Sequence, residues 1–102
     1  MDNKLFPSHL NRGSKGPAVM FLQVLLIVQN FNRDIVPDGD YGDQTAKGVV
    51  ELQKFLNDES GTKILELDGN FGQATRAEYK RYFDLDIDAL PASIFAGTTQ
   101  VV

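Results

Sequence analysis

The chain has 102 residues, of which 42% are hydrophobic and 24% charged, so we expect one soluble globular domain with a modest core. Fourteen acidic residues against ten lysines and arginines give a formal net charge of -4, which argues against nucleic acid and against a polybasic membrane surface. The sequence has no cysteine, and this excludes disulfides and thiolate metal sites.

The N-terminal part of the chain predicts a loop and then a core helix. Residues 1–11 contain no apolar run of the kind that a secretory signal requires, so no signal peptide is visible. The longest apolar stretch, Met20–Val28, is interrupted only by Gln23 and is much shorter than the roughly 20 residues of a membrane span. We therefore expect a central helix from Ala18 to about Gln29, preceded by a proline that suits the first helical position.

Two further helices are predicted from the spacing of apolar residues. One is expected over about 43–57, and the other over about 73–83. Their expected buried residues lie at helical spacing: Val49, Leu52 and Leu56, then Tyr79, Tyr82 and Phe83. The short extended segments Ile35–Val36 and Ile64–Leu67 are expected either to pair as a minimal ribbon or to form loop.

The periodic pattern ends after Asp84. Pro91 breaks any helix in the following segment, and 97–100 is rich in small and polar residues. We therefore divide the chain into one domain over 1–84 and a C-terminal tail over 85–102. The tail contains apolar residues and is expected to dock either on the body of the protein or on a partner: Ile94, Phe95, Val101 and Val102.

An internal repeat precedes the second and third predicted helices. The segment 38–45, Asp-Gly-Asp-Tyr-Gly-Asp-Gln-Thr, recurs 30 residues later at 68–75 as Asp-Gly-Asn-Phe-Gly-Gln-Ala-Thr. Such repetition indicates one supersecondary unit used twice. Asp-Gly favours a turn, the aromatic residue anchors it on the core, and we expect Asp43 or Gln73 to supply a helix-capping side chain.

The order of these motifs resembles a known family. Gly13, Gly16, Pro17, Val19, Leu22, Gln23 and Leu26 fit the pattern G-x-x-G-P-x-V-x-x-L-Q-x-x-L. The first repeat fits D-G-x-[YF]-G-x-x-T and continues to Leu52 and Gln53, and a second copy follows at 68–75. Over about residues 12–83 the chain is similar to the bacterial peptidoglycan-binding domain, a three-helix module found on many cell-wall hydrolases.

Three features depart from the family pattern. Gly48 stands where alanine is usual, 58–67 is longer and more polar, and 78–82 replaces a short apolar ending. These differences concern the shape of the binding groove and leave the expected fold unchanged.

The resemblance implies an all-α fold, a compact three-helix bundle containing two D-G-x-[YF]-G turn-helix units. It implies a non-catalytic module that binds peptidoglycan, requires no cofactor, and works in the cell wall, the periplasm or outside the cell. The expected ligand-binding residues lie at the repeat turns and on the third helix: Asp40, Tyr41, Asn70, Phe71, Arg76 and Tyr79. For Tyr41 and Phe71 the alternative is core packing, and for Arg76 it is a solvated charge.

A second functional hypothesis remains open, that of a protein–protein docking module with the same fold and no glycan affinity, in a phage, secreted or envelope assembly. Its partner would bind through the C-terminal tail, whereas a wall-binding module could recruit a cell-wall hydrolase.

No enzyme is expected, because neither His9 nor any serine belongs to a recognisable catalytic motif. A calcium site is not expected either, since the repeat lacks the ligand spacing of an EF-hand.

Overall fold

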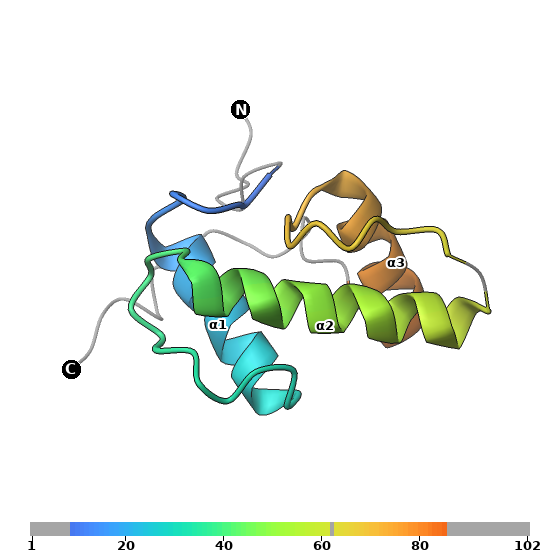
Figure 1. Ribbon diagram of the computed structural model, residues 1–102, viewed down its shortest axis with the longest axis horizontal. Helices are drawn as coiled ribbons and strands as arrows, with labels where there is room; N and C mark the ends of the chain where they lie inside the picture. Colours follow the sequence, from blue (N-terminus) through green and yellow to red (C-terminus); the bar gives the residue numbers. More distant parts are fainter. Residues whose placement is uncertain (1–8, 62, 86–102) are drawn as a thin grey trace.

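The computed structural model describes residues 9–61 and 63–85 and contains three helices, α1 (Pro17–Val28), α2 (Asp43–Ser60) and α3 (Gln73–Phe83) (Figure 1). Among these residues there is no strand, and only two isolated antiparallel bridges occur. The predicted all-α three-helix bundle is therefore confirmed. The predicted tail lies outside the described residues apart from Leu85, whose side chain packs against the core.

The long helix α2 is the centre of the bundle. It packs against both other helices, and Figure 1 shows α1 and α3 crossing behind its two halves. The outer helices meet where the Tyr79 hydroxyl donates a hydrogen bond to the side-chain carbonyl of Gln29 at 3.4 Å. None of the helices within 9–61 and 63–85 is long and apolar enough to cross a membrane.

The core combines residues of all three helices with residues of the loops. Its fully buried members include the predicted stripe of α2, namely Val49, Leu52 and Leu56. Tyr79 is buried as expected, but the expected burial of Tyr82 was wrong, because 45% of this residue is exposed. Tyr82 instead lies at the edge of an aromatic cluster on the surface, where its ring centroid is 5.0 Å from that of Phe55.

Proline and glycine residues determine where the helices begin and end, and the predicted side-chain caps are absent from α2 and α3. Pro17 is the first residue of α1, and α2 continues three residues beyond the predicted Asn57. It ends where Gly61 adopts a left-handed conformation, φ 77°, and donates its N–H to the carbonyl of Asn57. The predicted capping side chains do not cap: glycines occupy the N-cap positions of α2 and α3, and neither cap makes a side-chain hydrogen bond.

The segment 9–16 runs across both repeats and ties them together. Leu10 exchanges two backbone hydrogen bonds with Phe71 in the second repeat, at 3.1 and 2.8 Å. Further along, the backbone carbonyl of Tyr41 in the first repeat accepts a hydrogen bond from the N–H of Gly13. The N–H of Tyr41 donates one to the backbone carbonyl of Ser14, and both distances are 3.0 Å. Leu10 is buried, so it anchors this otherwise exposed or half-buried segment on the core. Of the two alternatives for 35–36 and 64–67, a minimal ribbon or loop, the structure shows loop in both segments.

Gly48 marks a close contact between α2 and its surroundings. A Cβ atom at this position would lie 3.0 Å from Cδ1 of Ile35 and 3.2 Å from Cδ1 of Leu26. Glycine therefore allows α1 and the following loop to approach α2 closely. This contact accounts in physical terms for the departure from alanine noted in the sequence.

Candidate functional site

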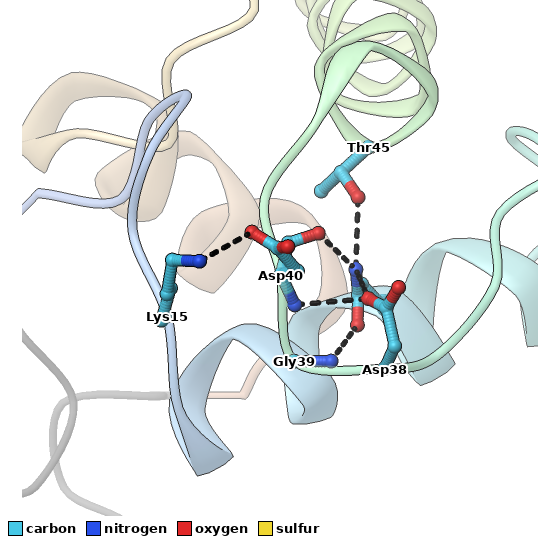
Figure 2. Close-up of polar contacts among 6 residues, drawn as sticks. Lys15, Asp38, Gly39, Asp40 and Thr45 are labelled. Carbon is cyan, nitrogen blue, oxygen red and sulfur yellow. Dashed lines mark hydrogen bonds and ion pairs between the residues drawn. The ribbon is translucent and has the colours of Figure 1, made fainter.

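A glutamine side chain of α1 organises the first repeat. The amide nitrogen of Gln23 lies 3.0 Å from the Thr45 hydroxyl and 3.3 Å from a carboxylate oxygen of Asp38. It also lies 3.0 Å from the backbone carbonyl of Asp40, and its own carbonyl accepts the backbone N–H of Gly39 at 2.8 Å. Figure 2 shows these loop residues gathered around one point. Since Gln23 is 1% exposed, the turn is held from inside the protein.

The second repeat has the same arrangement, shifted by 30 residues. Gln53 of α2 contacts Thr75 at 3.1 Å, Asp68 at 3.0 Å and the carbonyl of Asn70 at 3.0 Å. The N–H of Gly69 donates to its side-chain carbonyl at 3.1 Å. Each helix thus holds the turn that starts the next helix. The sequence pattern contained both glutamines but did not reveal this role, because a buried amide at helical spacing has no distinctive local signal.

The aromatic residues of the repeats lie beneath the turns. Tyr41 is 1% exposed and Phe71 is 0% exposed. The Tyr41 hydroxyl donates to the backbone carbonyl of Gly69 at 2.5 Å, which joins the first repeat directly to the second. Burial raises the pKa of Tyr41 well above its ordinary value. Both aromatic residues therefore fix the geometry of the turns and present no ring to solvent.

The remaining predicted ligand-binding residues divide into buried and exposed ones. Tyr79 is 2% exposed and Arg76 is 6% exposed, so the alternative for Arg76, a solvated charge, was wrong. The Arg76 guanidinium carbon lies 5.4 Å from the centroid of the Phe71 ring, a cation–π distance. Asp40 and Asn70 are exposed. Of the six residues, these two occupy equivalent positions in the repeats and are open to a ligand.

A hollow of about 420 Å³ lies beside the second repeat. We call it the second-repeat hollow. It is formed by the turn, the start of α3, the preceding loop and the histidine of the N-terminal segment: His9, Gln53, Ile64, Leu65, Glu66, Asp68, Asn70, Gly72, Gln73, Ala74 and Thr75. His9 is exposed, and its placement against Gly72 makes it one wall of the hollow.

A smaller hollow of about 230 Å³ lies beside the first repeat. Every residue of this first-repeat hollow has a counterpart 30 positions later in the larger one: Gln23, Asp34, Val36, Asp38, Asp40, Gly42, Asp43, Gln44 and Thr45. The two differ in charge. The described residues of the first include four carboxylates. Of these, Asp40 lies 3.7 Å from Lys15 (Figure 2). Asp43 lies 2.9 Å from Arg12.

The second-repeat hollow is less acidic and richer in amides. Among the described residues that line it, the carboxylates are Glu66 and Asp68. Asn70 and Gln73 stand where the first copy has aspartates, and Ile64 adds an apolar side chain that is 54% exposed. This surface combines hydrogen-bond donors and acceptors with an apolar contact. Within the described residues, no cluster of three or more histidines or acidic side chains is arranged to hold a metal ion.

The same contacts lower the pKa values of the two repeat aspartates, Asp38 and Asp68. The backbone N–H of Asp40, followed by the Gln23 amide, holds the pKa of Asp38 below its ordinary value of 3.8. Partial burial acts to raise the pKa of Asp68, but hydrogen bonds from the Asn70 N–H and the Gln53 amide outweigh it, so this pKa is also lowered. Both turns are therefore built around ionised aspartates.

Replacing either glutamine with alanine tests its structural role. Gln23→Ala and Gln53→Ala each leave a glycine N–H and several oxygens without their buried partner, so each variant should lose about 2–4 kcal/mol of unfolding free energy. Urea denaturation followed by circular dichroism measures the loss. Gln73→Ala, at an exposed position, is the control and should change stability by less than about 0.5 kcal/mol. Losses of the control's size in both glutamine variants would contradict the assigned role.

Acid should weaken the fold through Asp38 and Asp68. A carboxyl whose folded-state pKa is below its unfolded-state value contributes stability that is fully present above the unfolded pKa and is lost as the pH falls through the folded pKa. Replacing both with asparagine should therefore reduce the fall in urea midpoint between about pH 6 and about pH 3. The control, Asp58→Asn with Glu59→Gln, removes two exposed charges from α2 and should keep the wild-type pH dependence. An unchanged pH dependence in the Asp38 and Asp68 variant would refute this account.

Comparison of the chain with protein-family models, with curated proteins and with solved structures finds no match. The functional inference therefore rests on the sequence motifs and on the geometry of the two repeats and their hollows.

Proposed function

We propose that this protein is a non-catalytic module that binds bacterial peptidoglycan and localises itself or a partner protein to the cell wall. The observation that supports this most directly is the second-repeat hollow, where exposed Asn70 and Gln73 lie beside the exposed apolar side chain of Ile64. The order of sequence motifs, which resembles the peptidoglycan-binding domain, points to the same ligand class.

The chemistry of the hollow suits an acetamido sugar. An acetamido group has one N–H donor, one carbonyl acceptor and one methyl group. The carboxamides of Asn70 and Gln73 each offer both a donor and an acceptor, and Ile64 offers an apolar contact for the methyl group. Glu66 and Asp68 add acceptors for sugar hydroxyls or for an amine of a wall peptide. The proposal needs neither a metal ion nor a cofactor.

The buried residues of the predicted site have an indirect role in this proposal. Tyr41, Phe71, Arg76 and Tyr79 lie under or beside the turns and keep them in place. Among the described residues, no phenylalanine or tyrosine ring lines the second-repeat hollow, so the buried aromatic residues of the repeats offer no stacking surface for a sugar there. We therefore assign ligand contact to Asn70 and its exposed neighbours, and structural support to the buried set.

Binding through this hollow should be weak for a single site. The contacts available are a few solvent-exposed hydrogen bonds and one aliphatic side chain, and these must offset the loss of translational freedom. Weak sites are effective on a polymer, because many copies of the same unit raise the local concentration of the module and of anything attached to it. A partner protein of the module would then act on the wall to which it is held.

The test is retention on purified, teichoic-acid-free peptidoglycan sacculi. The wild-type protein should co-sediment, and Asn70→Ala combined with Gln73→Ala should reduce the bound fraction about tenfold, since each removed hydrogen-bonding side chain contributes about 0.5–1.5 kcal/mol. Circular dichroism checks that the variant is folded. The matched control is Glu51→Ala with Lys54→Ala, an exposed ion pair on α2 whose removal also leaves the net charge unchanged.

Two results would contradict the proposal, one concerning the location of the site and the other the function itself. Unchanged retention of the variant with Asn70→Ala and Gln73→Ala would place the binding surface elsewhere than the second-repeat hollow. Absence of wild-type retention would refute glycan binding and favour the alternative, a protein–protein docking module with this fold.

A further inference from the structure

A separate hollow of about 380 Å³ lies between the loop that follows α1 and the outer side of α2. We call it the loop–α2 hollow. The loop and the helix both line it: Phe31, Asn32 and Asp34 from the loop, and Gln44, Lys47, Val50 and Glu51 from α2. It shares no residue with the second-repeat hollow, and only Asp34 and Gln44 with the first-repeat hollow.

Contacts within the protein fix the polar side of this hollow. A Cβ atom at Gly48 would lie 3.4 Å from that of Asn32, so glycine lets the loop lie close against α2. The Asn32 amide nitrogen donates to the backbone carbonyl of Gln44 at 2.8 Å and to its side-chain carbonyl at 3.0 Å. Because this carbonyl is engaged, the NH2 group of the Gln44 side chain is left to donate to a ligand.

The apolar side of the hollow is formed by Phe31 and Val50, which are both half-buried. The Phe31 ring makes an edge contact with the ring of Phe55, at a centroid distance of 5.6 Å. This contact holds the Phe31 ring in place. The hollow therefore offers a fixed apolar wall, which suits an aliphatic side chain.

Two opposite charges from different elements line the same hollow. Asp34 of the loop and Lys47 of α2 are both exposed. Within 9–61 and 63–85, neither side chain makes an ion pair or a hydrogen bond; Asp34 uses only its backbone N–H, which donates to Asn32. Glu51, by contrast, already pairs with Lys54 at 3.2 Å. One carboxylate and one ammonium group are thus open to a ligand.

We infer that the loop–α2 hollow binds a small zwitterion with an aliphatic side chain, either a free amino acid or the end of a short peptide. Its carboxylate pairs with the Lys47 ammonium and accepts from the Gln44 NH2 group. Its ammonium group pairs with Asp34, and its side chain lies against Phe31 and Val50. The inference concerns a different surface from the second-repeat hollow and does not depend on the proposed function.

The opposite charges also select the ligand class. A ligand with a carboxylate alone is repelled by Asp34, and a ligand with an ammonium group alone is repelled by Lys47. A ligand that carries both groups satisfies both side chains and is favoured over either single-charge analogue.

Titration of the isotope-labelled, full-length protein with leucine at neutral pH, followed by NMR, tests the inference. The signals of the Gln44 side-chain amide and of the Lys47 and Val50 backbone amides should shift and saturate. The Kd should be in the millimolar range, because so small a ligand gains little on an open surface. Glycine, which lacks the apolar side chain, and N-acetyl-leucinamide, which lacks both charges, should each bind at least about fivefold more weakly.

Variants of the two charged residues locate the binding. Lys47→Gln and Asp34→Asn should each weaken leucine binding about threefold, since each removes one exposed ion pair with the ligand. Lys63→Gln and Asp58→Asn make the same changes of charge at exposed positions that do not line the hollow, and they are the matched controls. Circular dichroism verifies that all four variants are folded.

A second titration distinguishes the two sources of such a zwitterion. In the dipeptide leucyl-alanine the ammonium and carboxylate groups are one residue further apart than in leucine. Tighter binding of the dipeptide identifies the end of a peptide as the ligand, and tighter binding of leucine identifies a free amino acid.

Three results would overturn the inference. The first is absence of saturable shifts at the residues of the loop–α2 hollow. The second is an affinity for N-acetyl-leucinamide equal to that for leucine, because the charges would then have no role. The third is a loss of affinity in Lys47→Gln and Asp34→Asn no larger than in their controls.

Discussion

A buried carboxamide at the centre of each turn is the constraint on which the rest of this structure depends. Gln23 and Gln53 each satisfy a glycine N–H, a backbone carbonyl, a threonine hydroxyl and an aspartate. An amide has both a donor and an acceptor end, so one side chain can meet these opposite demands inside the core. The position of each helix start is thereby fixed by the helix before it.

The two units form a single structure because other contacts cross between them. The Tyr41 hydroxyl reaches the Gly69 carbonyl, and the segment 9–16 pairs its backbone with both turns. These hydrogen bonds hold the backbone of both turns in place. The exposed side chains that line the hollows therefore project from a fixed backbone. Asp40 and Asn70, which differ between the copies, are exposed residues and can change ligand preference at little cost to the fold.

The sequence predicted the three helices and the repeat because helical spacing and the Asp-Gly turn are local signals. It did not predict what depends on tertiary contact. Tyr82 has the spacing of a core residue but faces solvent, and Arg76 carries a charge but is buried against Phe71. Leu10 joins the core from a polar segment. The site residues predicted at the repeat turns included Tyr41 and Phe71, whose burial a sequence pattern cannot distinguish from exposure.

Native-state hydrogen exchange of the Gly39 and Gly69 amides tests the central claim most directly. Both N–H groups donate to a buried glutamine, so both should exchange only through global unfolding, with similar protection close to that of the core amides of α2. Exchange of either amide at the rate of an exposed loop, while α2 stays protected, would show that the glutamine does not hold the turn.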